Sequence, residues 1–176
     1  MGRTADIARK IRKDALVFAV AALALLADQV SKILIRVYLP EQESVSLGLP
    51  VRLTHTTNNG AAFSFLQGQT VLFIVISIVV IGVILTYERF LPASGRLLKL
   101  SLGLQLGGAL GNLIDRLLFA GKVTDFIDVG FWPIFNLADS SISVGVVILI
   151  FLLLFAEEGK NKPLQASHDD SQRVSG

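Results

Sequence analysis

The sequence predicts an all-α integral membrane protein with four transmembrane helices and a small extracytoplasmic β-sheet in the first outer loop. Of the 176 residues, 52% are hydrophobic and 17% are charged, whereas soluble domains carry about a quarter charged residues. Four stretches also reach the roughly 20 apolar residues that a helix needs to cross a bilayer. The net charge of +2 comes without a basic stripe, so no nucleic-acid partner is predicted.

The four predicted spans follow one another along the chain. They run from Ala15 to about Leu39, from about Thr70 to Tyr87, from about Leu97 to Asp115, and from about Leu137 to Ala156. The basic N-terminus and the apolar run behind it are similar to a secretory signal. Cleavage at Ala22-Leu23-Ala24 would halve the first span and leave an odd number of crossings, so we expect an uncleaved anchor.

The basic residues predict the orientation, because Lys and Arg concentrate in cytoplasmic loops. Five of the 16 precede the first span, three join the second and third spans, and three follow the fourth. We therefore expect both termini in the cytoplasm, as a basic segment 1–14 and a polar, disordered tail 157–176. Between them lies a membrane domain, 15–156, whose loops at about 40–69 and 116–136 are extracytoplasmic.

The first outer loop alternates apolar and polar residues from Val45 to Thr54, and a period of two predicts a strand. Pro50 favours an edge position in a sheet. The pair Asn59-Gly60 is a hairpin-turn signal. We expect a small sheet on the outer membrane face, with its apolar side toward lipid or substrate.

Polar side chains lie near the outer ends of three spans. Asp28 and Lys32 share one face of the first span, Asn112 and Asp115 are neighbours in the third, and Asp139 begins the fourth. A charge at the centre of a span costs about 2.5–3.5 kcal/mol and is tolerated when it faces protein or water. Taken alone, Asp28 with Lys32 also fits a structural ion pair, Asp115 with Arg116 the polar end of a helix, and Asp139 an ordinary N-cap. Their convergence at one depth is what predicts a functional site.

The residue content of the chain excludes several other kinds of catalytic or binding site. It has no cysteine, which excludes a thiol nucleophile, disulfides and thiolate metal sites. His55 and His168 are isolated, so neither a metal site nor a histidine triad is predicted. A serine–lysine pair such as Ser64 with Lys32 stays open on chemistry alone. Glycines at intervals of four in the third span favour close helix packing over phosphate binding, at Gly103, Gly107 and Gly111.

Five motifs resemble those of the bacterial lipoprotein signal peptidases, also called signal peptidase II. They are DQVSK at 28–32, NNGAAFS at 58–64, GALGNLIDR at 108–116, VTDF at 123–126 and FNLADS at 135–140. Five motifs in family order across residues 15–156 are highly specific. The resemblance implies four spans with an extracytoplasmic β-cradle, in the bacterial cytoplasmic (inner) membrane, with the active site near the outer leaflet.

The resemblance implies an intramembrane aspartyl endopeptidase with its catalytic pair at Asp125 and Asp139. Spacing alone favours Asp115 instead, because Asp125 follows no periodic pattern, and only the VTDF motif selects Asp125. Two carboxyl groups in a small site share one proton, so one can activate water while its protonated partner hydrogen-bonds the developing oxyanion. This chemistry requires no metal and no cofactor, and which aspartate plays which role stays open.

Further family positions match residues of this chain. Asn58, Asn112, Arg116 and Asn136 fall on positions that orient the substrate backbone and the carboxyl pair, although Asn58 also fits a purely structural turn. The remaining substrate-binding or supporting positions fall on Asp28, Lys32, Gly60, Asp115 and Ala138.

The implied substrate is a prolipoprotein whose lipobox cysteine carries diacylglycerol, cleaved before that cysteine to release the signal peptide. The other implied partners are membrane lipids and the cyclic peptide inhibitor globomycin, and we expect a monomer. Two alternatives are a small ion-coupled transporter or proton-pathway subunit, because membrane carboxylates mark such pathways, and a non-enzymatic assembly factor. A proton or ion pathway needs polar groups across the whole bilayer. The carboxylates here lie at one end, and the second span and the cytoplasmic halves of the spans lack them, which argues against a pathway.

Overall fold

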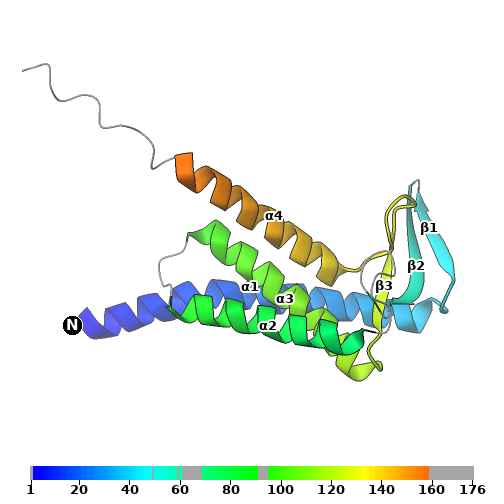
Figure 1. Cartoon of the computed structure of the whole chain (residues 1–176), viewed down its shortest axis with the longest axis horizontal. Coiled ribbons are helices and arrows are strands. Elements are labelled where there is room, and N and C mark those ends of the chain that lie inside the picture. The colour runs from blue at the N-terminus through cyan, green and yellow to red at the C-terminus, as the bar shows by residue number, and fades with distance from the viewer. Residues whose placement is uncertain (1, 49, 59, 61–68, 91–94, 159–176) are drawn as a thin grey trace, which may run out of the picture.

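The computed structural model describes residues 2–48, 50–58, 60, 69–90 and 95–158. The elements are α1 (Gly2–Tyr38), β1 (Ser44–Gly48), β2 (Val51–Asn58), α2 (Thr70–Phe90), α3 (Arg96–Leu118), β3 (Val123–Asp128) and α4 (Leu137–Glu158). Figure 1 shows the helices extending along the molecule, with the sheet at one end. Each helix is long and apolar enough to cross a membrane, which confirms the predicted spans and makes this a multi-pass membrane protein.

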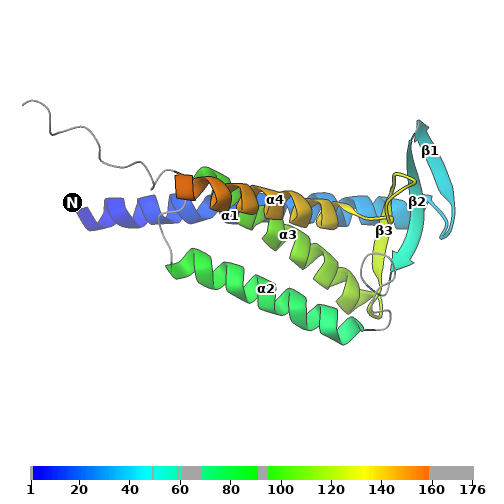
Figure 2. The same ribbon diagram turned by 45° about the horizontal axis from the view of Figure 1, so that its top comes forward.

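Helix α3 lies at the centre of the bundle. Its span is 61% buried, whereas the span in α2 is only 6% buried. Helices α1 and α4 make the most extensive contacts with α3, and Figure 2 shows α2 on the other side of α3. The core joins α1, α2 and α3 through Val17, Ala21, Ile84, Leu102 and Leu106. Much of the surface of α2 and α4 is exposed and apolar, as lipid-facing helices require.

Glycines bring α1 and α4 close to α3. A Cβ atom on Gly107 would lie 2.5 Å from the carbonyl oxygen of Ala21 in α1. A Cβ atom on Gly108 would lie 2.5 Å from the carbonyl oxygen of Ala138 in α4. The structure therefore confirms the packing role of the glycine series, and it adds a second glycine-lined contact, between Gly108 and α4.

The sheet is antiparallel, with strand order β1, β2, β3. The alternating run predicted as a strand folds back as a hairpin, in which Val45 of β1 faces Leu53 of β2. Pro50 lies in the connecting turn, and β1 is the edge strand. The hairpin turn therefore comes earlier than Asn59-Gly60. Asn59 lies outside the described residues, and Gly60 follows the end of β2.

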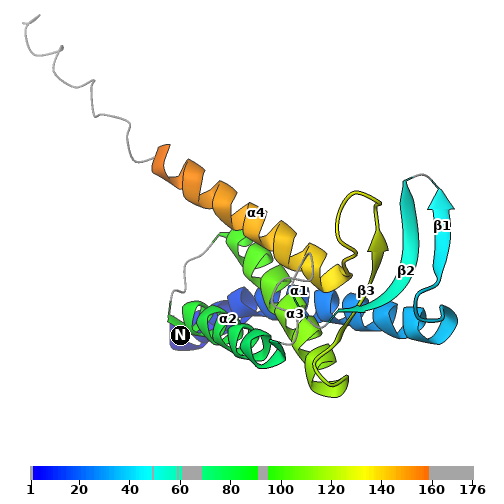
Figure 3. The same ribbon diagram turned by 45° about the vertical axis from the view of Figure 1, so that its right-hand side comes forward.

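Strand β3 has no counterpart among the sequence predictions, which leave Asp125 in a loop. All of its residues except Ile127 are buried, because the strand pairs with β2 and packs against the end of α1. A strand covered on both faces shows no alternation of apolar and polar residues. Figure 3 shows β3 between β2 and the helix bundle. This strand is the element that carries Asp125 to the helices.

Candidate active site

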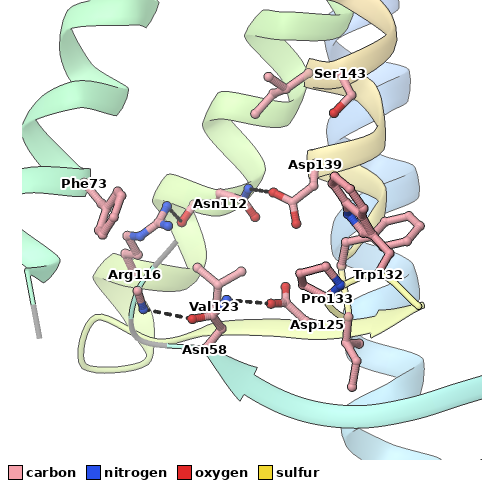
Figure 4. Close-up of a pocket in the computed structure, with 14 residues that line it drawn as sticks. Asn58, Phe73, Asn112, Arg116, Val123, Asp125, Trp132, Pro133, Asp139 and Ser143 are labelled. Atoms are coloured by element: carbon pink, nitrogen blue, oxygen red, sulfur yellow. Dashed lines mark hydrogen bonds between the residues drawn. The ribbon is translucent and has the colours of Figure 1, made fainter. Parts of the chain in front are cut away.

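A cleft of about 320 Å³ lies where the sheet meets α3 and α4. Figure 4 shows its lining, with Asp125 entering from β3 and Asp139 from α4. Asn58, Asn112 and Arg116 also line the cleft. The structure thus brings together residues from four of the five motifs. Asp115, which spacing alone favours, is not among the lining residues.

Asn136 connects the two carboxyl groups. Its side-chain Nδ2 donates to Asp125 Oδ1 at 2.7 Å, and its backbone nitrogen donates to Asp139 Oδ2 at 3.3 Å. Its Oδ1 accepts from the backbone nitrogen of Asp139 at 2.9 Å. Asn136 is therefore the N-cap of α4, and Asp139 completes a reciprocal capping pair three residues later. Asn136, and not Asp139, is therefore the N-cap residue, while Asp139 takes part in the capping pair and also lines the cleft.

Two more amides hold the carboxylates from the other sides. Asn112 Nδ2 in α3 donates to Asp139 Oδ1 at 2.7 Å. Asn58 Nδ2 at the end of β2 donates to Asp125 Oδ2 at 3.1 Å, while its Oδ1 accepts from the backbone nitrogen of Gly60 at 2.9 Å. Asn58 thus shapes the chain after β2 and also reaches the carboxylate.

The pKa of Asp125 is raised to about 7. Burial of the side chain is the main cause, and the negative charge of Asp139 is the second. Hydrogen bonds from Asn58 and Asn136 and the charge of Lys32 act in the opposite direction. Near neutral pH the site can therefore hold one proton and one negative charge, the state that acid–base chemistry by two carboxyl groups requires.

A fully buried ion cluster lies next to the cleft. Lys32 Nζ lies 2.9 Å from Asp28 Oδ2 and 3.3 Å from Asp115 Oδ2. Lys32 also donates to Asn112 Oδ1 at 3.0 Å, which turns the amide nitrogen of Asn112 toward Asp139. The three charged side chains have no exposed surface. They are paired with one another, as buried charges must be.

The ion cluster also places β3 and α4. Asp115 Oδ2 accepts from the backbone nitrogen of Thr124 at 3.0 Å, next to Asp125. Asp28 Oδ1 accepts from the backbone nitrogen of Ala138 at 2.9 Å, next to Asp139. Asp28 and Asp115 thus each bond the backbone beside one cleft aspartate.

Two polar residues outside the predicted site join this cluster. Gln29 Nε2 donates to Asp28 Oδ2 at 3.1 Å and to the carbonyl oxygen of Gly111 at 3.1 Å. Arg36 Nη1 donates to Thr124 Oγ1 at 2.9 Å and lies 3.6 Å from Asp115 Oδ1. The spacing of Arg36, four residues after Lys32, is the sequence signal for its place on this face.

Arg116 completes the wall of the cleft toward α2. Its Nη1 donates to the carbonyl oxygen of Asn112 at 3.4 Å. Its guanidinium lies 5.1 Å from the centroid of the Phe73 ring of α2, within the range of a cation–π contact. Figure 4 shows Arg116 on the side of the cleft opposite Trp132. The guanidinium is a hydrogen-bond donor at the edge of the cleft.

His55 bonds the backbone away from the cleft and is not among its lining residues. His55 Nδ1 lies 2.7 Å from the carbonyl oxygen of Leu39, a contact that ties β2 to the end of α1. Ser64 and His168 lie outside the described residues. At the far end of the bundle, Glu88 of α2 pairs with Lys99 of α3 at 3.0 Å, and both are buried. Glu88 follows the predicted end of the second span at about Tyr87, and Lys99 lies within the predicted third span, so a buried charged pair also exists at the end of the bundle away from the cleft.

Comparison with known proteins identifies similar chains. The family model described as Signal peptidase (SPase) II matches residues 20–155. A lipoprotein signal peptidase from Moorella thermoacetica is 48% identical over 143 residues, which cover 80% of this chain and 95% of the relative. One from Halothermothrix orenii is 45% identical over 139 residues, covering 78% and 94%. A solved bacterial membrane enzyme at 2.3 Å resolution has a TM-score of 0.77 and 31% identity, covering 86% of this chain and 94% of that one.

Proposed function

The chain belongs to the signal peptidase (SPase) II family of aspartic-type signal peptidases, and we propose that it removes signal peptides from prolipoproteins with Asp125 and Asp139 as its catalytic pair. One observation carries the assignment of the pair. Two carboxyl groups from different elements line one cleft and are bridged by Asn136. The carboxylate of Asp115 instead forms an ion pair with Lys32 and accepts a hydrogen bond from the backbone nitrogen of Thr124.

The pair performs hydrolysis by sharing one proton. A carboxylate accepts a proton from a water molecule in the cleft, and that water attacks the scissile carbonyl carbon. The protonated partner donates a hydrogen bond to the carbonyl oxygen as negative charge develops there. Because the pKa of Asp125 is raised to about 7, the pair retains one proton near neutral pH. The leaving amine then takes a proton from the pair as the peptide bond breaks, which resets the site.

The substrate is a prolipoprotein whose lipobox cysteine carries diacylglycerol. The cleft lies at one end of four helices that can span a membrane, so acyl chains in that leaflet keep the scissile bond at the depth of the carboxyl pair. The distribution of Lys and Arg supports cytoplasmic termini. The cleft then faces the outer leaflet of the bacterial inner membrane, where a monomer binds its substrate and the cyclic peptide globomycin.

The decisive experiment compares Asp125→Asn, Asp139→Asn and Asp128→Asn. Asp128 is the matched control, because it lies on the same strand as Asp125 but bonds Arg52 at 2.7 Å and is not among the residues that line the cleft. Cleavage of a diacylglyceryl-modified prolipoprotein is followed by gel shift, with unmodified prolipoprotein alongside. We expect each cleft variant to lose at least about 10²-fold in rate, the range for removal of an acid–base group, and Asp128→Asn to retain activity.

Two outcomes would contradict the proposal. A folded Asp125→Asn or Asp139→Asn protein that cleaves at the normal rate would remove that residue from the catalytic pair. Full activity at saturating globomycin would contradict the proposed inhibitor. Equal cleavage of the unmodified prolipoprotein would contradict the proposed substrate. Neither result would contradict the assignment of the carboxyl pair.

A further inference from the structure

The loop between β3 and α4 presents two aromatic side chains at the molecular surface. Phe131 is 84% exposed and Trp132 is 54% exposed. The turn before them is fixed by Gly130, which has φ +81° and donates its backbone N–H to Asp128 Oδ1 at 2.8 Å. Figure 3 shows the loop arching from the end of β3 to the start of α4. Large apolar side chains exposed side by side mark a surface that meets lipid or protein.

The depth of this loop follows from the end of α1. Ile35 and Leu39 pack against Phe126 of β3, so the sheet lies beside the last turns of α1, as Figures 1 and 3 also show. Other side chains of those turns are apolar and exposed, at Leu34, Val37 and Tyr38. A transmembrane helix keeps such side chains in lipid, with aromatic residues at the boundary. The leaflet therefore reaches the level of the sheet.

The aromatic loop is continuous with the lipid-facing surface of α4. A second cleft of about 390 Å³ is lined by Phe131 and Trp132 together with Ser143 and Val144 of α4. Val144 is 52% exposed and begins the exposed apolar face of that helix. Among the described residues that line this cleft, the one charged side chain is Asp139, which the first cleft shares. An apolar surface thus passes from the loop onto the span.

We propose that Phe131 and Trp132 insert into the interface of the leaflet nearest the sheet and anchor the β3–α4 loop to the membrane. Both side chains suit this place. The phenyl ring of Phe131 gains from burial among acyl chains, and the amphipathic indole of Trp132 is of the kind that concentrates at membrane–water interfaces. A lipid surface is the occupant that matches the exposed apolar faces of α1 and α4 on either side.

The anchor lies close to both catalytic elements along the chain. Phe131 follows the end of β3 at Asp128 by three residues, and Trp132 precedes the start of α4 at Leu137 by five. With so little chain on either side, the depth of the two rings limits the depth of both elements. The loop therefore holds the strand of Asp125 and the helix of Asp139 at one level of the leaflet before substrate arrives.

The test uses Trp132 as its own probe, because the chain has one tryptophan. The full-length protein is reconstituted without substrate in phosphatidylcholine vesicles, and its emission is quenched by lipids spin-labelled near the headgroup, by lipids labelled deep in the acyl chain, and by aqueous iodide. We expect a blue-shifted emission that loses most intensity to the shallow label. A Trp132→Phe, Phe151→Trp protein is the deep reference, because Phe151 lies on the exposed face of α4, and should show the reverse order of quenching.

Two variants separate the anchor from the chemistry. Phe131→Asp should shift the emission of Trp132 to the red and weaken quenching by the shallow label, whereas Phe131→Leu should retain both signals. Because the proposal rests on the spans crossing a membrane and not on the carboxyl pair, an Asp125→Asn protein should behave as the wild type. Quenching by iodide with none by lipid labels would overturn the anchor. Quenching that begins only when a prolipoprotein with spin-labelled acyl chains is added would also overturn it, and would assign the aromatic pair to substrate.

Discussion

At the scale of single residues, the site depends on asparagine side chains whose nitrogen and oxygen atoms bond different partners. Asn136 donates to Asp125 with its side-chain nitrogen and caps α4 with its side-chain oxygen. Asn112 accepts from Lys32 on its oxygen, which directs its nitrogen to Asp139. An aspartate at either position would lack the amide donor and add a third carboxyl group to the cleft. The amides therefore set the orientation and the charge of the pair at once.

The first prediction concerns pH. Because the pKa of Asp125 is raised to about 7, the pair loses its shared proton as the pH rises through about 7, and kcat/KM should fall over that interval. The hydrogen bond from Asn58 stabilises the charged form and so lowers the pKa of Asp125. Asn58→Leu removes this donor, and the pKa of Asp125 should rise further. We expect the alkaline limb of the profile to move upward by about one pH unit or more, since a hydrogen bond to a charged group contributes about 1.5–3 kcal/mol.

The matched control for this profile is Thr57→Val. Thr57 precedes Asn58 on β2 and donates to Glu41 Oε1 at 2.6 Å, in an exposed contact. Its removal should leave the limb in place. A limb that stays fixed in Asn58→Leu, or moves to lower pH, would contradict the link between this amide and the proton of Asp125.

At the scale of elements, β3 is held to the helices by three bonds to one residue. Thr124 donates its backbone nitrogen to Asp115, accepts from Arg36 at its hydroxyl, and accepts from Asn136 at its carbonyl oxygen at 3.4 Å. Arg36 also lies 4.3 Å from the centroid of the Phe119 ring at the end of α3. The helices and the N-cap of α4 thus hold Thr124, next to Asp125, in addition to the pairing of β3 with β2.

The second prediction compares the two arginines that bond residues of β3. Arg36→Met removes the hydrogen bond to the Thr124 hydroxyl and the cation that lies 3.6 Å from Asp115 Oδ1, which costs about 1–3 kcal/mol, and should lower kcat by about ten- to a hundredfold through misplacement of Asp125. Arg52→Met removes the bond to Asp128 at the other end of the strand. Arg52 is 51% exposed, and surface pairs contribute about 0–1 kcal/mol. Thermal unfolding in detergent and the cleavage assay measure both, and equal losses for the two variants would refute the asymmetry.

The third prediction concerns helix packing. Gly107→Ala places a methyl group against the α1 backbone, and overpacking of this kind costs about 1–3 kcal/mol. Gly82→Ala in α2 is the control, because a Cβ atom there meets nothing within 4 Å, and alanine favours a helix over glycine by about 1 kcal/mol. Thermal unfolding in detergent should show a lower midpoint for Gly107→Ala and an equal or higher one for Gly82→Ala. A neutral Gly107→Ala would mean that α1 does not pack this closely.

At the scale of the whole molecule, the helices and much of the polar cluster could be predicted from the sequence, but the strand that carries Asp125 could not. Runs of apolar residues reveal each span directly, and spacings of three and four place Asp28, Lys32, Asn112 and Asp115 at one depth. The burial of β3 on both faces removed the alternation that would have revealed it. Spacing therefore favoured Asp115 over Asp125, and only the VTDF motif selected Asp125. The two residues differ in their tertiary contacts. Asp115 pairs with Lys32 and accepts a hydrogen bond from the backbone of Thr124, whereas Asp125 lines the cleft.

The last prediction concerns the orientation of the whole chain in the membrane. The chain has no cysteine, so single cysteines report accessibility without background. Ser46→Cys lies on the exposed strand β1, and Gly95→Cys lies at the other end of the bundle, where a Cβ atom meets nothing within 4 Å. In right-side-out vesicles a membrane-impermeant maleimide should label Ser46→Cys and should label Gly95→Cys only after permeabilisation. Inverted vesicles should give the reverse result. The opposite pattern would place the cleft on the cytoplasmic side, where the basic residues of segment 1–14 and of the α2–α3 connection would then contradict the usual charge rule.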